Sequence, residues 1–368
     1  MTNKLEPEKT KFLNIDIYKT NTLKRLADKK NVARTYPIKN SDLMFIKKCP
    51  VCRSGPLSLI SQVYLRSKLV FLETSSCPDC LFTFRTISPK LAWFKKCWKI
   101  IYNGKMEVFN PDVEELRKRR YQEYLEILPK YTRGNKVLDI GAAYGTGANL
   151  FKIHGWDVET VEPEISKVNY VRNFFNIPVV SDSIENFVLK KIKYDLVIFS
   201  QTLEHIDRPV FVIENIKNLL TPGSGILYIE IPVLENYVNW NDSLYLPHKC
   251  NFTEQNIVAL LKHNGFEILD KFFVRQHSKE TPWDVGMILK YSGNKKAFSI
   301  KPGLTLNDVK KIYRKDWPLK KVPPLEWTLK YNVPHIEQFF QILNLKNKVM
   351  IGPNLEKDFV SFKDSKNK

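Results

Sequence analysis

The chain has 368 residues, with 58 Lys and Arg against 39 Asp and Glu, which gives a formal net charge of +19. This length predicts two or three domains, and contents of 43% hydrophobic and 12% aromatic residues argue against a disordered chain. No apolar run approaches the roughly 20 residues of a membrane span, which argues against a transmembrane protein. The charged N-terminus shows no apolar signal segment, so we expect a cytoplasmic, reducing location.

The net charge has two interpretations. Solvated lysines scattered over the surface would explain it without any partner. Alternatively, it indicates an anionic partner, which could be nucleic acid, a phosphorylated small molecule or an anionic membrane surface. The last of these would place the protein at the inner face of the membrane.

Residues 1–40 are predicted to form a polar N-terminal arm, and residues 41–90 contain short β-like runs with two Cys-x-x-Cys pairs. Residues 91–134 are predicted to be a helical linker or lid, in which Pro111 and Asp112 open a helix. The Trp- and Lys-rich stretch 91–105 either packs on its own domain or contacts a membrane, a glycan or a nucleotide.

The two cysteine pairs predict a metal site. Each pair can present two thiolates to one ion, so Cys49, Cys52, Cys77 and Cys80 would complete a tetrahedral structural zinc site. A redox pair or unpaired thiols are the alternatives. Cys97 and Cys250 stand alone and are interpreted as ordinary thiols.

Residues 135–292 alternate between apolar runs and helical stretches. Runs such as VLDIG, DVETVE, YDLVIFS and GILYIEIP predict a mainly parallel sheet with helices on both faces. The later runs FEILDKFFV and WDVGMILKY lie close in sequence and predict an antiparallel pair at the sheet edge. Residues 293–368 form a basic C-terminal extension, with a helix predicted at HIEQFFQILN and a strand at KVMIG.

A Gly-rich turn follows the first of these strands. Its glycines allow a ligand to approach the backbone, and the next helix offers free N–H groups. Asp139 stands just before the turn, where it would repel a pyrophosphate and suit a cationic amino group. Glu162 ends the next strand, where an acid can bind both hydroxyls of a ribose. A ligand with a ribose and an amino acid end therefore fits better than NAD.

In five ordered pieces, residues 135–292 resemble class I S-adenosylmethionine-dependent methyltransferases, of the methyltransferase-23-like kind. The pieces are LDIGAAYGTG, Glu162, Asp182-Ser183, YDLVIFSQTLEHIDRP and LLTPGSGILYIEIP. The resemblance implies an α/β, Rossmann-like, seven-stranded methyltransferase domain preceded by a small zinc-ribbon domain. A dinucleotide-binding fold is the alternative.

The resemblance also implies S-adenosylmethionine as the cofactor. The residues that it assigns to the cofactor are Asp139, Gly141, Ala143, Tyr144, Gly145, Glu162, Asp182, Ser183, Ser200 and Gln201. One departure is that Ala143 replaces the usual middle glycine. Its methyl group is tolerated at a negative φ and costly at a positive one, so cofactor binding could be weakened.

A Cys₄ ribbon ahead of such a domain resembles a bacterial group associated with polysaccharide and nucleotide-sugar biosynthesis. It implies a sugar hydroxyl or sugar carbon, in a nucleotide-sugar or glycan, as acceptor. O-methylation is favoured, because nothing in the sequence establishes the acidic carbon that C-methylation needs. A divalent-metal O-methyltransferase is not indicated, because no second carboxylate cluster is evident.

Methyl transfer to a hydroxyl calls for a base near the sulfonium carbon. His205 follows the fourth strand, at the carboxyl edge where ligands bind, and is the first candidate base, with Glu204 as its orienter or as a second carboxylate. The resemblance also implies that His248, after the fifth strand, lies close to the acceptor, which makes it the second candidate, and Tyr245 is a weaker one. Alternatively, the segment LEHIDRP could be the start of a helix in which His205 forms a hydrogen bond with a structural role only.

Two other functions remain open from the sequence. The protein could be an RNA methyltransferase that binds RNA through the zinc ribbon and the lysines. The fourth strand, however, continues into SQTLEH and not into Asn-Pro-Pro-Tyr, which disfavours methylation of base amines. Alternatively, the domain could be a non-catalytic binding module, as Ala143 would allow. The oligomeric state stays open.

Overall fold

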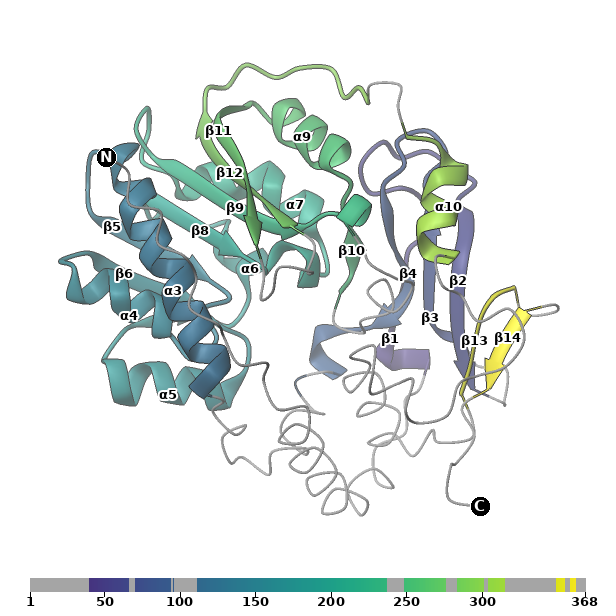
Figure 1. The fold of residues 1–368 in the computed structure, drawn as a ribbon, viewed down its shortest axis with the longest axis horizontal. Helices are drawn as coiled ribbons and strands as arrows, with labels where there is room; N and C mark the ends of the chain where they lie inside the picture. The colour runs from purple at the N-terminus through teal and green to yellow at the C-terminus, as the bar shows by residue number, and fades with distance from the viewer. Residues whose placement is uncertain are drawn as a thin grey trace, which may run out of the picture.

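The computed structural model describes residues 40–65, 70–93, 95, 111–236, 248–275, 283–300, 304–314, 349–354 and 358–361. These residues form two seven-stranded sheets, of which the methyltransferase-like sheet lies on the left in Figure 1 and the cysteine-bearing sheet on the right. The predicted N-terminal arm, most of the stretch 91–105, Tyr245 and the helix predicted at 335–344 lie outside the described residues.

The larger sheet has the strand order β11-β12-β9-β8-β5-β6-β7. Its five parallel strands are β5 (Lys136–Ile140), β6 (Asp157–Val161), β7 (Val179–Ser181), β8 (Leu196–Ser200) and β9 (Ile226–Pro232). The antiparallel strands are β11 (Phe266–Arg275) and β12 (Trp283–Tyr291), and β12 lies between β9 and β11. The predicted mainly parallel sheet with an antiparallel pair at its edge is therefore confirmed.

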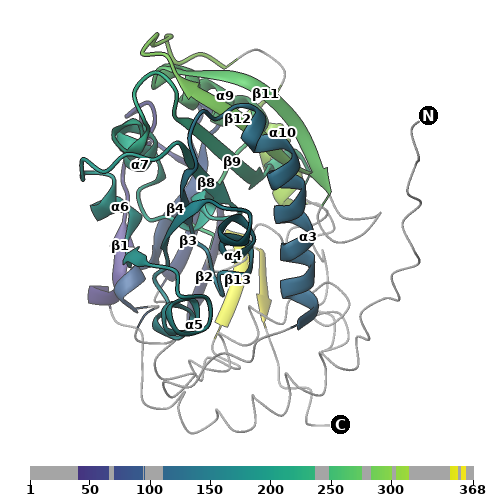
Figure 2. The ribbon, with the colours of Figure 1, turned by 90° about the vertical axis from the view of Figure 1, so that its left-hand side faces the viewer.

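Helices cover both faces of this sheet. The helices of one face are α3 (Pro111–Ile127), α4 (Thr146–Ile153) and α5 (Ile165–Phe175), and those of the other are α6 (Ile184–Phe187), α7 (Pro209–Asn215) and α9 (Glu254–His263). Figure 2 shows α3 on the opposite side of the sheet from α6 and α7. Side chains of a strand alternate between faces, so in β8 Ile198 belongs to the core on the side of α3, α4 and α5, and Phe199 to the core on the side of α6, α7 and α9. The central strands are apolar throughout because both faces are covered.

The strand order places a crevice at the carboxyl ends of β5 and β8. From β5 the chain continues to β6 on one side, whereas β8 pairs with β5 on the other. Ligands of open α/β sheets bind where the strand order reverses in this way. The loops after β5 and β8 are therefore the expected ligand-binding loops of this sheet.

The second sheet is antiparallel, with the order β1-β4-β3-β2-β13-β14. Its strands are β1 (Leu43–Phe45), β2 (Ser58–Leu65), β3 (Val70–Ser76), β4 (Thr83–Pro89), β13 (Val349–Asn354) and β14 (Asp358–Ser361). Strand β10 (Cys250–Asn251) also pairs with β4. Segments from the predicted ribbon, the methyltransferase-like region and the C-terminal extension thus share one sheet, and β13 covers the edge that β2 would otherwise expose.

The C-terminal extension also supplies helix α10 (Leu306–Arg314). Val309 and Tyr313 of this helix are buried against Ile60 of the second sheet and Leu234, which follows β9. The extension therefore packs where the two sheets meet. Five short 3₁₀ turns complete the described elements: η1 (Asn40–Asp42), η2 (Leu128–Lys130), η3 (Leu203–His205), η4 (Ile216–Leu219) and η5 (Leu234–Asn236).

Candidate functional site

The Gly-rich turn lies at the carboxyl end of β5, against the segment that follows β8. Gly141 has a φ of +79°, and a Cβ added there would come within 2.3 Å of Thr202 Oγ1. A side chain at this position would therefore clash, and glycine allows the two loops to touch. The predicted cofactor turn and the predicted catalytic segment thus meet at the crevice.

Ala143 has a φ of +50°, which is the left-handed conformation that costs free energy for any residue with a Cβ. Its backbone N–H donates a hydrogen bond of 2.9 Å to Oε2 of Glu162. Gly145, with a φ of +76°, then caps the start of α4, and Tyr144 between them is buried. The alanine is therefore held in the costly conformation by the acid of the next strand.

Asp139 is buried beside α3 with one carboxylate oxygen available. The hydroxyl of Tyr121 donates to its Oδ1 at 2.8 Å, and its Oδ2 has no hydrogen-bond partner among the described residues. Burial raises the pKa of this carboxyl to about 7, although the bond from Tyr121 acts in the other direction. The cationic amino group of a ligand would satisfy Oδ2, so this acid fits the amino acid end of S-adenosylmethionine.

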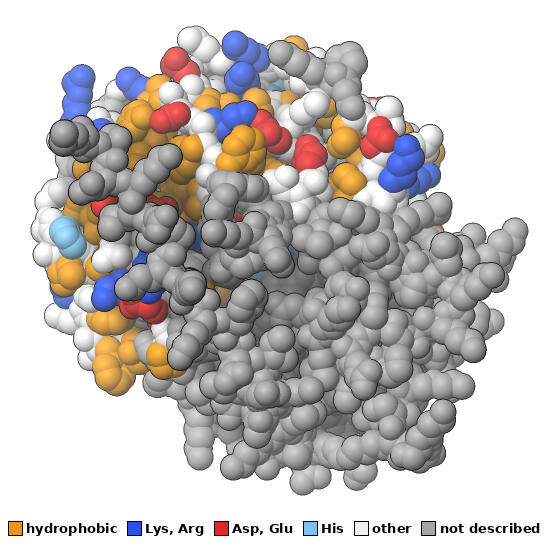
Figure 3. All heavy atoms as spheres, viewed as in Figure 1, with side chains coloured by type: hydrophobic (Ala, Val, Ile, Leu, Met, Phe, Trp, Pro, Cys, Tyr) orange, Lys and Arg blue, Asp and Glu red, His pale blue; other side chains and the backbone are white. Residues whose placement is uncertain are grey.

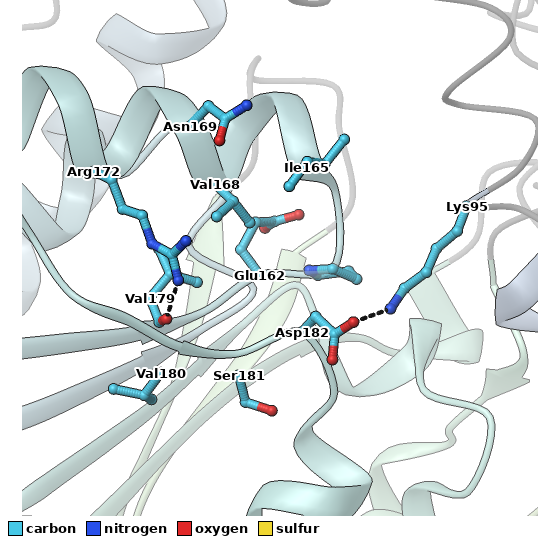
Figure 4. A pocket seen from close by; sticks show the side chains of 11 residues that line it. Lys95, Glu162, Ile165, Val168, Asn169, Arg172, Val179, Val180, Ser181 and Asp182 are labelled. Atoms are coloured by element: carbon cyan, nitrogen blue, oxygen red, sulfur yellow. Dashed lines mark hydrogen bonds and ion pairs between the residues drawn. The ribbon is translucent and has the colours of Figure 1, made fainter. Parts of the chain in front are cut away.

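A cavity of about 690 Å³ opens beside Glu162, at the ends of β6 and β7. Figure 4 shows the side chains of Glu162 and Asp182 at this cavity, with Ile165 and Val168 on its apolar wall. A cavity of this size suits a small ligand, and polar groups beside an apolar wall suit an adenosine. Burial raises the pKa of Glu162.

Asp182 has a protein partner at the mouth of this cavity. Lys95 Nζ lies 2.6 Å from its Oδ2, and this contact lowers the pKa of the Asp182 carboxyl. Ser183, the next residue, caps the start of α6 and hydrogen bonds to Glu185 at 3.0 Å. The structure thus places Asp182 on the cavity wall, and Ser183 outside that lining.

Ser200 and Gln201, at the end of β8, also lie outside the cavity lining. Ser200 Oγ hydrogen bonds to the hydroxyl of Tyr124 at 2.8 Å, and Gln201 Nε2 donates to Asp284 at 2.6 Å. These contacts direct both side chains toward α3 and β12. Whether they also contact the cofactor stays a prediction.

A buried polar network lies under α3, and the sequence patterns do not predict it. Tyr124 and Tyr228 donate to Oε2 of Glu230 at 2.6 and 2.8 Å. Arg120 lies 3.0 Å from the other oxygen of Glu230 and 4.0 Å from Asp284. The spacing of Arg120 and Tyr124, one turn apart on one helix face, is a sequence signal that could have indicated it. The network fixes α3, and with it Tyr121, against the sheet.

Glu204, His205 and His248 come together at the carboxyl edge of the sheet. Oε1 of Glu204 lies 3.9 Å from Nε2 of His205 and 4.0 Å from Nε2 of His248, and the two imidazole ring centres are 4.7 Å apart. Burial raises the pKa of Glu204 to about 8 and lowers that of His248 well below its ordinary value. Burial therefore favours the neutral imidazole form of His248 within the cluster.

The second sheet holds His248 in place. The side chain of Arg85 in β4 donates from its Nε to the backbone oxygen of His248 at 3.2 Å. The backbone N–H of Arg85 donates to the backbone oxygen of Lys249 at 2.8 Å. Lys249 in turn donates its backbone N–H to the backbone oxygen of Glu204 at 2.6 Å. The cysteine-bearing sheet and the methyltransferase-like sheet therefore build the histidine cluster together.

The four cysteines of the two Cys-x-x-Cys pairs converge at the end of the second sheet. Sγ of Cys49 lies 3.5 Å from that of Cys80, and Sγ of Cys52 lies 3.4 Å from that of Cys77. Four sulfur atoms at 2.3 Å from one tetrahedral zinc would be about 3.8 Å apart, so the arrangement fits zinc with little movement. A bound zinc would cross-link the two loops that flank β2 and β3.

Residues 113–271 match a family model described as "Methyltransferase domain". The chain is 30% identical over 106 residues to a ubiquinone biosynthesis O-methyltransferase of Haemophilus ducreyi, a match that covers 26% of this chain and 44% of that protein. It thus spans less than half the length of that curated relative. The matched region includes most of α3, which the sequence predicts to belong to a linker or lid.

Solved structures that match include S-adenosylmethionine-dependent methyltransferases of two organisms. The match to that of Archaeoglobus fulgidus has 19% identity and a TM-score of 0.39, and covers 48% of this chain and 93% of that one. The match to that of Clostridium acetobutylicum has 13% identity and a TM-score of 0.39, and covers 54% and 97%. In the described part of the chain, no helix is long and apolar enough to cross a membrane.

Proposed function

We propose that residues 113–271, which match a methyltransferase domain model, form a class I S-adenosylmethionine-dependent methyltransferase domain, and that this protein transfers a methyl group to a hydroxyl of a sugar, in a nucleotide-sugar or a glycan intermediate. The observation that carries the proposal is the cluster of Glu204, His205 and His248. It lies at the carboxyl edge of the sheet, and Thr202, two residues before Glu204, approaches the Gly141 turn.

The bound cofactor would supply an electrophilic methyl group on a sulfonium. Asp139 would bind its amino group through the unpartnered Oδ2, and Glu162 would hold its ribose hydroxyls at the cavity. Both acids lie at the ends of neighbouring strands, β5 and β6. The residues of β5 and β6 thereby align the methyl carbon with an acceptor that approaches from the β8 side.

A sugar hydroxyl needs to lose its proton as the new bond forms, because it is a weak nucleophile at neutral pH. If the cluster acts without a bound cation, His205 is the base that we favour, since its side chain is 34% exposed and an acceptor can reach it. His248 is 14% exposed and Glu204 is 1% exposed. His248 and Glu204 would therefore position His205 and the acceptor, and His205 would contact the acceptor hydroxyl.

The sugar acceptor rests on the combination of a Cys₄ cluster with this catalytic domain. We propose that the cluster binds one structural zinc, which holds the second sheet and, through Arg85, the position of His248. O-methylation is favoured over C-methylation because the cluster offers a base for a hydroxyl. The curated relative is by name an O-methyltransferase that acts in ubiquinone biosynthesis.

RNA is the second candidate acceptor, because the chain carries a net charge of +19. On the face shown in Figure 3, the basic side chains of the described residues are interspersed with acidic and apolar ones. Some described cations are also engaged in ion pairs, as Lys95 is with Asp182 and Lys249 with Asp207. These observations favour a small or neutral acceptor over RNA.

A comparison of two histidine variants tests the proposed mechanism. His205→Gln should lower kcat by about 100-fold or more, the typical contribution of a general base, and leave the affinity for S-adenosylmethionine unchanged. His154→Gln, a histidine at the end of α4, serves as the control and should keep the full rate. Equal rates for the two variants would exclude His205 from the reaction.

A further inference from the structure

Three side chains with metal-binding atoms converge on one point at the edge of the larger sheet. The ligand atoms of Glu204, His205 and His248 all lie within 4.8 Å of one another. Nε2 of His205 and Nε2 of His248 face the same oxygen of Glu204, at 3.9 and 4.0 Å, and the two rings are inclined at 71°. The three donors therefore surround a common space instead of stacking side by side.

The separation of the donors is close to what one metal ion requires. Two donors that bind a tetrahedral ion at about 2.1 Å lie about 3.4 Å apart, so each of the two Glu204–histidine distances would need to contract by roughly half an ångström. Two imidazoles and one carboxylate, with further positions open, form a ligand set typical of catalytic zinc and non-haem iron. Imidazole nitrogen suits these transition metals better than Mg²⁺ or Ca²⁺, which prefer oxygen.

Glu204 provides a second, independent observation. Its side chain is 1% exposed, and neither carboxylate oxygen has a hydrogen-bond partner among the described residues. A buried polar group without a partner is costly, and a buried carboxylate more so. The nearby guanidinium of Arg120 lies against Glu230 and Asp284. A cation in the cluster would provide what this carboxylate lacks.

The backbone of the cluster is fixed before any ligand arrives. The N–H of Lys249 donates to the backbone oxygen of Glu204 at 2.6 Å, which joins the two loops that carry Glu204 and His248. Arg85 binds the backbone oxygen of His248 from the second sheet. Because 34% of the His205 side chain remains exposed, the cluster is open to solvent on that side. A bound cation would thus keep an accessible coordination position.

We propose that Glu204, His205 and His248 bind one divalent transition-metal cation, such as Zn²⁺, Mn²⁺ or Fe²⁺. This inference deepens the proposed function and rests on it for its catalytic role. The acceptor hydroxyl would bind the cation at the open position, which lowers the pKa of that hydroxyl. Its proton would pass to water, its oxygen would form the bond to the methyl carbon, and the C–S bond would break with its electron pair left on sulfur. His205 then acts as a ligand and not as the base.

Metal content of the purified full-length protein tests the site. After loading with zinc and desalting, the wild type should hold two zinc ions per chain, one in the Cys₄ cluster and one in the histidine cluster. Glu204→Gln and His205→Gln should each hold one. His263→Gln, a histidine at the end of α9, is the matched control and should hold two.

Cobalt substitution assigns each ion to its cluster. A cobalt ion in the Cys₄ cluster shows a thiolate charge-transfer absorption, whereas a cobalt ion bound by Glu204, His205 and His248 shows none. The second equivalent of cobalt should therefore bind without adding to this absorption, and Glu204→Gln should abolish its binding. One ion per chain in the wild type, or a second ion that survives both Glu204→Gln and His205→Gln, would overturn the inference.

The metal count does not depend on methyl transfer, so the two proposals fail separately. Methyl transfer by a protein that holds one metal ion would refute this site and leave the proposed function standing. Two metal ions in a protein that binds no S-adenosylmethionine would refute the proposed function and leave the site standing.

Discussion

The backbone N–H of Ala143 donates a 2.9 Å hydrogen bond to the carboxylate of Glu162, and the alanine adopts a left-handed conformation to do so. The acid at the end of β6 therefore shapes the turn at the end of β5, in addition to facing the cavity. Glu162 also accepts the N–H of Glu164 at 3.0 Å. One carboxylate thus links the two loops that we assign to the cofactor.

Glu162→Gln tests the assignment of this acid to the cofactor. A glutamine keeps one oxygen for the Ala143 N–H, but its NH₂ group cannot accept the N–H of Glu164, and it loses the charge that would bind the ribose hydroxyls. Because hydrogen bonds to a charged group contribute about 1.5–3 kcal/mol, the affinity for S-adenosylmethionine should fall by roughly 10- to 100-fold, and the lost Glu164 bond should lower the free energy of unfolding by about 1–3 kcal/mol. Isothermal titration calorimetry measures this. The exposed Glu126 of α3 provides the control, and equal affinities for Glu162→Gln and Glu126→Gln would place the cofactor elsewhere.

Ala143→Gly should stabilise the protein. Glycine adopts a φ of +50° without the Cβ clash, so the free energy of unfolding should rise by about 1 kcal/mol. Urea denaturation measures the change. Ala142→Gly, one residue earlier and without a positive φ, should instead destabilise by roughly 0.5–1 kcal/mol. If both variants lost stability alike, the left-handed conformation of Ala143 would be wrong.

Asp139 should make stability depend on pH. Burial raises its pKa from 3.8 to about 7, so between these values the folded protein holds a proton that the unfolded chain has released. The stability from this group is present at acidic pH and is lost as the pH rises through about 7, by at most about 1.4 kcal/mol per pH unit.

Asp139→Asn removes this titration and keeps an oxygen for the hydroxyl of Tyr121. The free energy of unfolding, measured with urea at several pH values from about 4 to 7, should therefore fall less with pH in the variant than in the wild type. Identical slopes would show that the carboxyl of Asp139 is ionised throughout this range.

Arg120→Met should destabilise the protein strongly, because it leaves Glu230 and Asp284 without their cation in a buried network. Removal of one partner from a buried ion pair typically costs about 3–5 kcal/mol. Arg119→Met, which removes an exposed pair with Glu115, should change the free energy of unfolding by less than about 1 kcal/mol. Chemical denaturation of both variants provides the comparison. A similar small effect in each would mean that the α3 network contributes little.

The larger sheet could be predicted from the sequence because each of its strands and turns is indicated by a pattern within a short segment of the chain. An apolar run such as Leu196–Ser200 indicates a strand that is buried on both faces. The Gly-rich turn after Ile140 indicates where the chain bends sharply. The proximity of Glu204 to His205 also follows from their adjacency. Such features depend on neighbours in sequence, and the structure places them as the pattern indicates.

What escaped prediction depends on contacts between distant segments. No local pattern brings His248 to Glu204, since the pairing of β10 with β4 does so from the other sheet. The same holds for β13, whose residue Val349 pairs with Leu65 of β2. Arg120 of α3 points into the domain because it contacts Glu230 of β9 and Asp284 of β12. The sequence predicts α3 only as part of a helical linker or lid.

Methyl-labelled S-adenosylmethionine offers the most direct measurement of the central claim. The purified full-length protein would be incubated with it and, in parallel, with nucleotide-sugars, a crude glycolipid fraction and total RNA. The account predicts label in a sugar-containing fraction, in amounts that depend on His205. Label in RNA would contradict the proposed acceptor, and no label in any fraction together with no binding of S-adenosylmethionine would contradict methyl transfer itself.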